Sequence, residues 1–106
     1  MSAIPERSRL EADLDQSFIF NLGDGRIARA RLIAVPSGIP MDDDYECYSA
    51  VFEFEPGLQL QQDVYHITSP AGESWDLLAT PHRPGAGGAA RLGVVIHCLR
   101  PPLQRA

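Results

Sequence analysis

Apolar and polar residues alternate along most of this chain, and residues that favour turns separate the alternating runs. The runs predict β-strands at 17–22, 26–35, 48–55, 62–68, 74–80 and 91–99. Asp24-Gly25 stands between the first two runs and favours a tight hairpin turn, because glycine readily adopts a positive φ. Six or seven short strands with closely spaced turns predict an all-β protein, either a small antiparallel barrel or a sandwich.

The length of 106 residues suits one β domain, with the strands filling residues 15–100. In the N-terminal segment, residues 1–14, Leu10 and Leu14 lie four positions apart. This spacing favours a short helix, and an extended edge segment is the alternative. Residues 101–106 are expected to form a flexible tail.

One antiparallel register between the strands at 26–35 and 48–55 suits their side chains on both faces. It sets small residues against large ones on the inner face and arginines against glutamates on the outer face. Its pairs are Ala30–Phe54, Leu32–Phe52, Ala34–Ala50, Arg29–Glu55 and Arg31–Glu53.

Charge is distributed unevenly along the chain, whose formal net charge is −5. All nine cationic residues are arginines, and none lies between Leu32 and His82, where nine acidic residues stand. A negative balance disfavours nucleic acid, which needs a basic surface to displace counterions. The acidic middle suits a basic protein partner instead.

The hydropathy of the sequence limits where in the cell the protein is expected. No run approaches the ~18 consecutive apolar residues of a membrane span, and the first residues show no apolar segment of the secretory kind. We therefore expect a cytoplasmic protein that binds neither nucleic acid nor a membrane.

The residues whose side chains could take part in acid–base chemistry have simpler interpretations as strand residues. Glu53 and Glu55 lie two apart on a strand, so both point outward and suit cross-strand pairing with arginine. Asp63 and His66 lie three apart on a strand, so they point to opposite faces and cannot form a dyad with each other.

No metal, cofactor or catalytic site is predicted. The run Asp42, Asp43 and Asp44 lacks the alternate ligand spacing of a calcium loop and suits a solvated loop. Cysteine and histidine positions lack the spacing of a zinc site. The segment GAGGAA, residues 85–90, follows prolines rather than a strand, so it is expected to be a hairpin loop rather than a dinucleotide fingerprint.

An exposed apolar patch is the more informative feature. Trp75 shares its side of the strand with Leu77 and Ala79 and is expected to anchor the core, which leaves Leu78 on the other face. With Val51, Val95 and Leu99, it would form such a patch, a frequent mark of protein contacts. The predicted interaction surface comprises Asp42, Asp43, Asp44, Glu53, Glu55 and Leu78.

The segment LQLQQDVYHITSPAGESWDLLATP, residues 58–81, resembles a family of small bacterial domains of unknown function with a pattern close to LxQGxYxLxHxxLGxxxLFLVP. The matching residues are Leu60, Gln62, Tyr65, Gly72, Leu77, Leu78 and Pro81. YSAVFEFEPG upstream and LGVVIH downstream extend the resemblance over roughly residues 15–98. Asp63 stands where glycine is usual, and TSPAGESW varies the turn. The resemblance implies no catalytic residues. Genes for domains of this family often lie near genes for phage tail-collar-like proteins, which implies an accessory role in a phage-tail-like assembly.

A non-enzymatic interaction or structural module, with a protein partner or a second copy, is therefore the expected function. One alternative is a barrel that binds a small ligand at its mouth near Tyr65, Trp75 or His66. The other is an enzyme, which would need His66, His82 or His97 to meet a carboxylate across strands.

Overall fold

A computed structural model of the chain describes residue 5 and residues 7–23, 25–37, 45–58 and 60–99, without the side chains at 45, 46, 86 and 97–99. Its elements are α1 (Arg7–Ala12), β1 (Ser17–Gly23), β2 (Arg26–Ala34), β3 (Tyr45–Pro56), β4 (Asp63–Thr68), β5 (Ser74–Pro81), a 3-10 turn (Ala86–Gly88) and β6 (Ala89–Leu99). The six strands form a closed antiparallel barrel, which confirms the all-β prediction and selects the barrel over the sandwich. The short N-terminal helix also forms.

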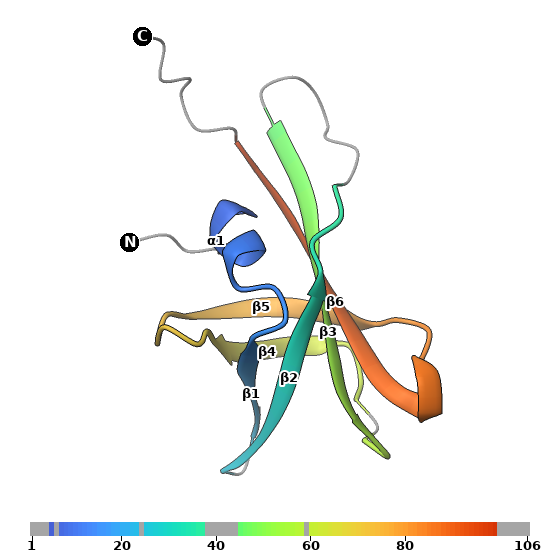
Figure 1. Cartoon of the computed structure of the whole chain (residues 1–106). Coiled ribbons are helices and arrows are strands. Elements are labelled where there is room, and N and C mark those ends of the chain that lie inside the picture. Colours follow the sequence, from blue (N-terminus) through green and yellow to red (C-terminus); the bar gives the residue numbers. More distant parts are fainter. Residues whose placement is uncertain (1–4, 6, 24, 38–44, 59, 100–106) are drawn as a thin grey trace, which may run out of the picture.

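The strand order around the barrel is β1-β2-β3-β6-β5-β4, and every neighbouring pair is antiparallel. Two meanders, β1–β2–β3 and β4–β5–β6, therefore meet along the β3–β6 and β1–β4 ladders. In Figure 1, β3 and β6 form a long twisted ribbon that crosses the β4–β5 hairpin. The connections β1–β2, β3–β4 and β5–β6 lie at one end of the barrel, opposite to α1.

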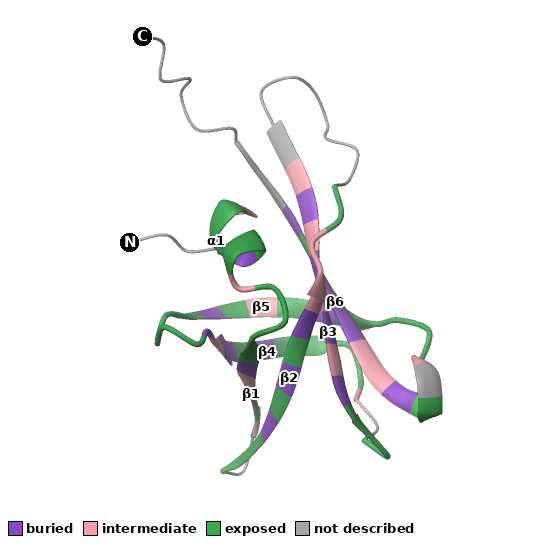
Figure 2. Cartoon of the chain, in the orientation of Figure 1, coloured by how far each residue is buried: buried purple, intermediate pink, exposed green. Residues whose placement is uncertain are grey.

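Aromatic rings fill the barrel interior. Burial alternates along the strands, as Figure 2 shows, and places every second side chain in the core. Phe20 is fully buried and meets Phe52, Phe54 and Tyr65 edge to face, with ring centroids 5.0, 4.8 and 5.8 Å away. Trp75 is also buried, which confirms its expected place in the core. These buried side chains belong to one continuous hydrophobic core.

Helix α1 covers one end of the barrel. Leu10, only 1% exposed, is the helical residue that joins the hydrophobic core. The following segment is fixed to β2 because the Asp15 N–H donates to the Leu32 carbonyl and the Leu32 N–H donates to the Gln16 carbonyl. Arg9 also reaches Glu73 at 3.3 Å, which links α1 to the β4–β5 turn.

The predicted register between β2 and β3 is correct at its centre and wrong at its end. Arg31 pairs with Glu53 and Leu32 with Phe52, as expected, but Ala34 pairs with Val51 instead of Ala50. A β-bulge between Leu32 and Ala34 adds one residue to the strand and shifts the pairing. The recorded ladder begins at Arg31–Glu53, so the expected Ala30–Phe54 and Arg29–Glu55 pairs are not part of it.

Most strand boundaries agree with the sequence pattern to within two residues, and β3 begins three residues earlier than predicted. GAGGAA contributes to the β5–β6 connection, as expected, with Gly87 and Gly88 at positive φ. Asp42–Asp44 and the tail at 101–106 lie outside the described residues. Within the described part of the chain, no helix is both long and apolar enough to cross a membrane.

Candidate functional site on the β4–β5 face

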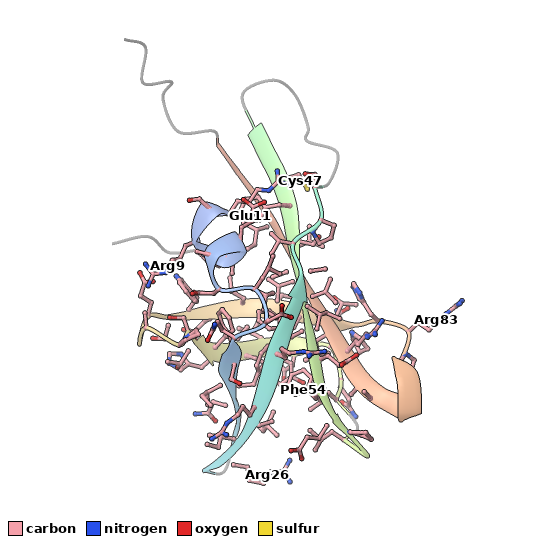
Figure 3. The ribbon with its side chains drawn as sticks, viewed as in Figure 1. Arg9, Glu11, Arg26, Cys47, Phe54 and Arg83 are labelled. Atoms are coloured by element: carbon pink, nitrogen blue, oxygen red, sulfur yellow. The ribbon has the colours of Figure 1, made fainter. Side chains whose placement is uncertain are left out.

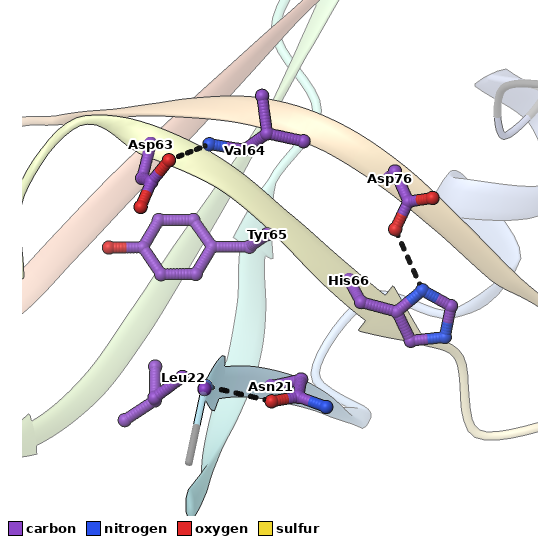
Figure 4. A pocket seen from close by; sticks show the side chains of 8 residues that line it. Asn21, Leu22, Asp63, Val64, Tyr65, His66 and Asp76 are labelled. Atoms are coloured by element: carbon purple, nitrogen blue, oxygen red, sulfur yellow. Dashed lines mark hydrogen bonds and ion pairs between the residues drawn. The ribbon is translucent and has the colours of Figure 1, made fainter.

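The outer face of the β4–β5 hairpin carries two adjacent cross-strand pairs. Tyr65 and Ile67 point into the core, so the intervening residues of β4 point outward. Val64 lies opposite Leu78, and His66 lies opposite Asp76. The hairpin thus places an apolar pair beside a histidine–carboxylate pair. Figure 4 shows His66, Asp76 and Val64 from close by.

His66 and Asp76 contact each other directly, with Nδ1 of the histidine 2.8 Å from Oδ1 of the aspartate. In the neutral imidazole tautomer that suits this contact, Nδ1–H donates to the carboxylate and Nε2 is left as an acceptor. Such an arrangement suits proton transfer at Nε2. The side chains are 50% and 71% exposed, so water screens their attraction strongly.

A shallow depression of about 290 Å³ lies beside this pair. Two of its polar side chains are oriented by hydrogen bonds to nearby backbone groups. Asn21 Oδ1 accepts from the Gly23 N–H, and Asp63 Oδ1 accepts from the Val64 N–H, each at 2.8 Å. Asp63 and His66 were expected on opposite faces of the strand, yet both line this depression. Asp63 accepts from the Val64 N–H, whereas His66 contacts Asp76. The depression is therefore bordered by pre-oriented carboxylate and amide groups.

Tyr65 forms the inner border of the depression and joins it to the core. Its hydroxyl donates to the Gln61 carbonyl at 2.6 Å. Burial raises the pKa of the Tyr65 phenol, and the nearby Asp63 carboxylate raises this pKa further, against the smaller opposing effect of the Gln61 hydrogen bond. The phenol therefore stays neutral at ordinary pH, and its single O–H is used by the Gln61 carbonyl.

Both side chains of the apolar pair are exposed. Val64 is 58% exposed and Leu78 is 52% exposed. Leu78, expected to share a patch with Val51, Val95 and Leu99, has Val64 as its partner in the β4–β5 ladder. Val51 is half-buried, Val95 on β6 is exposed, and the side chain of Leu99 lies outside the described residues.

Glu53 occupies a different surface, between two arginines. Its Oε2 accepts from Nε and Nη2 of Arg91 at 3.0 and 2.9 Å, and its Oε1 lies 3.5 Å from Nη2 of Arg31. The carboxylate is thus engaged within the barrel wall rather than presented to solvent. Glu55 is exposed, and Asp42–Asp44 lie beyond the described part of the chain.

The β4–β5 hairpin itself is acidic. Residues 63–81 include Asp63, Glu73 and Asp76 but no arginine or lysine. Arg9 of α1 partly compensates Glu73, and the two carboxylates nearest the Val64–Leu78 pair have no arginine partner within the described residues. The face therefore combines apolar side chains with a negative border.

His82 and Cys47, the other histidine and cysteine whose side chains the structure describes, do not line the depression. His82 lies in the β5–β6 connection against Gly93, and the side chains of His97 and Cys98 are outside the described residues. Cys47 is a half-buried free thiol on β3. Among the described residues, no three histidine, cysteine, aspartate or glutamate side chains gather closely enough to hold a metal ion.

A family model described as a domain of unknown function (DUF6916) matches residues 5–96, from the segment before α1 into β6. No curated protein and no solved structure matches the chain. The match covers both cross-strand pairs of the β4–β5 face and the connections at both ends of the barrel.

Proposed function

The chain belongs to the family described as domain of unknown function DUF6916, and we propose that it is a protein-interaction module whose β4–β5 face binds a basic protein partner. The observation that carries this proposal is the directly paired Val64 and Leu78, both more than half exposed. Single exposed aliphatic residues are common on proteins, but contiguous apolar surface with a polar border is typical of a contact site.

Charge indicates which kind of partner fits. Asp63 precedes Val64, and Asp76 is two residues from Leu78 on the same outer face. A second copy docking through the same face would bring these carboxylates toward their own equivalents, and like-charge contact is unfavourable. A partner with apolar side chains surrounded by arginine or lysine would complement both features.

The wider setting that we propose is an accessory or structural role in a phage-tail-like assembly in the bacterial cytoplasm. The support for it is the resemblance of the 58–81 segment to domains whose genes lie near tail-collar-like phage genes. A module of this kind would act through protein contacts, without nucleic acid, membrane or cofactor.

Comparative capture from a lysate of the source organism tests the proposal. The wild-type chain, Leu78→Asp and Ile27→Asp are immobilised at equal density, and captured proteins are identified by mass spectrometry. Ile27 is the matched control because it is 64% exposed and lies on β2, which β1 separates from β4. We expect at least one protein that Ile27→Asp retains and Leu78→Asp loses, with binding weakened by salt.

Thermal unfolding of each variant establishes that the fold is intact before capture is compared. Burying one aliphatic side chain at an interface contributes about 1.5–3 kcal/mol, so Leu78→Asp should weaken binding at least about tenfold. The proposal fails if no protein is captured by the wild type, or if the captured proteins are the same for Leu78→Asp and the wild type.

The His66–Asp76 pair favours a second candidate, an enzyme that uses His66 Nε2 as a general base. The pair meets across strands beside a depression, which is the arrangement that acid–base chemistry requires. Hydrolysis of a panel of activated esters by wild type and His66→Gln tests it, with Asp76→Asn as the variant that removes only the orienting group. Equal rates for wild type and His66→Gln would eliminate this candidate.

A further inference from the structure

A second cavity, of about 250 Å³, lies at the end of the barrel opposite to α1, between the β3–β4 and β5–β6 connections. Its apolar walls come from both connections: Leu58 and Leu60 on one side, Pro81 and Pro84 on the other. Arg91 and His82 also line it. This open cavity thus combines apolar walls with two nitrogen-bearing side chains, and it shares no lining residue with the depression beside His66 and Asp76.

Arg91 is held rigidly at this cavity. Nε and Nη2 of its guanidinium both donate to Oε2 of Glu53, at 3.0 and 2.9 Å, on the neighbouring strand. These contacts leave Nη1 without a hydrogen-bond partner among the described residues. Because Glu53 also contacts Arg31, two guanidinium groups share one carboxylate, and the cluster retains one net positive charge. An oriented, incompletely neutralised arginine is suited to bind a carboxylate.

The imidazole of His82 packs against Gly93 of β6, which has no side chain to block it. Its imidazole lies where the β-carbon of any larger residue at position 93 would stand, so Gly93 provides the space that the ring occupies. The backbone fixes the same place, because the His82 N–H donates to the Arg91 carbonyl at 2.8 Å. Arg91 and His82 are therefore adjacent through the backbone and both border the cavity.

The β5–β6 connection, which carries His82, passes close to the Arg91–Glu53 ion pair. The Gly85 N–H donates to the Ala89 carbonyl at 2.9 Å, and the Gly88 N–H donates to the Gly85 carbonyl at 3.1 Å. A β-carbon at Gly85 would come within 2.6–2.7 Å of the Arg91 guanidinium and the Glu53 carboxylate. The β5–β6 connection thus depends on glycine at position 85, where it passes the ion pair.

From this arrangement we propose that the cavity binds a small carboxylic acid with an aliphatic tail. The carboxylate bonds to the Arg91 guanidinium beside His82, and the tail lies among Leu58, Leu60 and the two prolines. The volume is below the ~300–1,000 Å³ of a drug-sized site, which favours a ligand with a short chain. This binding function is separate from the protein contact proposed for the β4–β5 face.

Hexanoate is the probe, with hexanamide as the uncharged analogue of equal length. Amide chemical shifts of the isotope-labelled chain are followed during titration, with a Kd near about 1 mM expected for so small a ligand. Shifts should centre on residues 81–92 and 57–60, and hexanamide should bind at least about tenfold more weakly, as loss of one charged contact predicts.

Matched variants assign the contacts. Arg91→Gln should weaken hexanoate binding at least about tenfold, whereas Arg83→Gln, in the β5–β6 connection but outside the cavity lining, should leave it within about twofold. Figure 3 shows Arg83 pointing away from the barrel. Leu58→Gln and Leu14→Gln form a second pair, with exposures of 37% and 38% in the wild type, and only the first should weaken binding.

The second pair keeps the test decisive if Arg91→Gln does not fold. Binding that survives Leu58→Gln, or that hexanamide reproduces at equal concentration, would overturn the proposal. A tripeptide that ends in leucine with a free carboxylate is also titrated. If it binds more tightly than hexanoate, the ligand is the C-terminus of a protein rather than a small acid, and the proposal is wrong. Loss of lysate capture by Leu78→Asp is unaffected by any of these results.

Discussion

Glu53 and Arg91 face each other across the β3–β6 ladder, and one carboxylate oxygen of Glu53 receives two hydrogen bonds from the Arg91 guanidinium. With Arg31 on the opposite side, this glutamate joins three neighbouring strands of the barrel wall. The Glu53 side chain is 21% exposed, so the contacts are partly shielded from solvent. The triad therefore stabilises the barrel wall more than an ordinary surface ion pair would.

Replacement of Glu53 by glutamine should reduce the free energy of unfolding by about 1–3 kcal/mol, because charge-assisted hydrogen bonds to both arginines are weakened together. Urea denaturation at neutral pH measures the change. Glu55→Gln is the matched control, since Glu55 is exposed on the same strand and should change stability by no more than about 0.5 kcal/mol. Equal losses for the two variants would show that the triad contributes no special stability.

The two leucines of the N-terminal segment should differ sharply in their contribution to stability. Leu10 is buried in the core, and Leu14 is 38% exposed. Leu10→Ala should cost about 2–5 kcal/mol, because it removes buried methyl groups and leaves a cavity beneath α1. Leu14→Ala should cost less than about 1 kcal/mol. Urea midpoints of both variants decide the matter, and a Leu10→Ala midpoint at the wild-type value would mean that α1 does not close the barrel.

Local alternation predicted the strands well because it records which side of each strand is buried. Phe52 and Phe54 could be placed inside from parity alone, and the charges of Arg31 and Glu53 identified their pairing. Alternation carries no information about a bulge, so the shift at Ala34 was missed. A bulge shifts the register by one residue but leaves no distinctive residue types in the sequence around it.

The candidate site was predicted less well than the fold because it depends on pairing between strands. His66 and Asp76 lie ten positions apart and meet only because the β4–β5 hairpin sets them opposite each other. The same register joins Val64 to Leu78. Testing hairpin registers around the Gly72 turn would have shown both pairs. Barrel closure through the β1–β4 and β3–β6 ladders joins segments far apart in sequence, and strand periodicity does not encode those partners.

Gly93 and His82 should be energetically coupled. Gly93→Ala places a β-carbon against the imidazole of His82 and should cost about 1–3 kcal/mol, the usual range for overpacking. In a His82→Ala background the added methyl group meets open space, so the cost should largely disappear. A double-mutant cycle from urea denaturation measures this coupling. Additive effects would show that the ring moves away freely and that Gly93 does not position it.

Tyr65 should make stability depend on pH in the alkaline range. Because burial and then Asp63 raise the folded-state pKa of this phenol, ionisation favours the unfolded chain. The contribution is complete below the unfolded-state pKa of about 10 and is lost as pH rises through the folded-state pKa. Tyr65→Phe should cost about 0.5–1.5 kcal/mol at neutral pH through loss of the bond to the Gln61 carbonyl.

Above about pH 10 the stability difference between wild type and Tyr65→Phe should therefore narrow, since only the wild type has this phenol to ionise. Urea denaturation of both proteins across the alkaline range measures the difference, and phenolate absorbance follows the titration. Asp63→Asn provides the control: it removes one of the two causes that raise the Tyr65 pKa, so the narrowing should be smaller. A difference that stays constant with pH would mean that the Tyr65 hydroxyl is as well solvated in the barrel as in the unfolded chain.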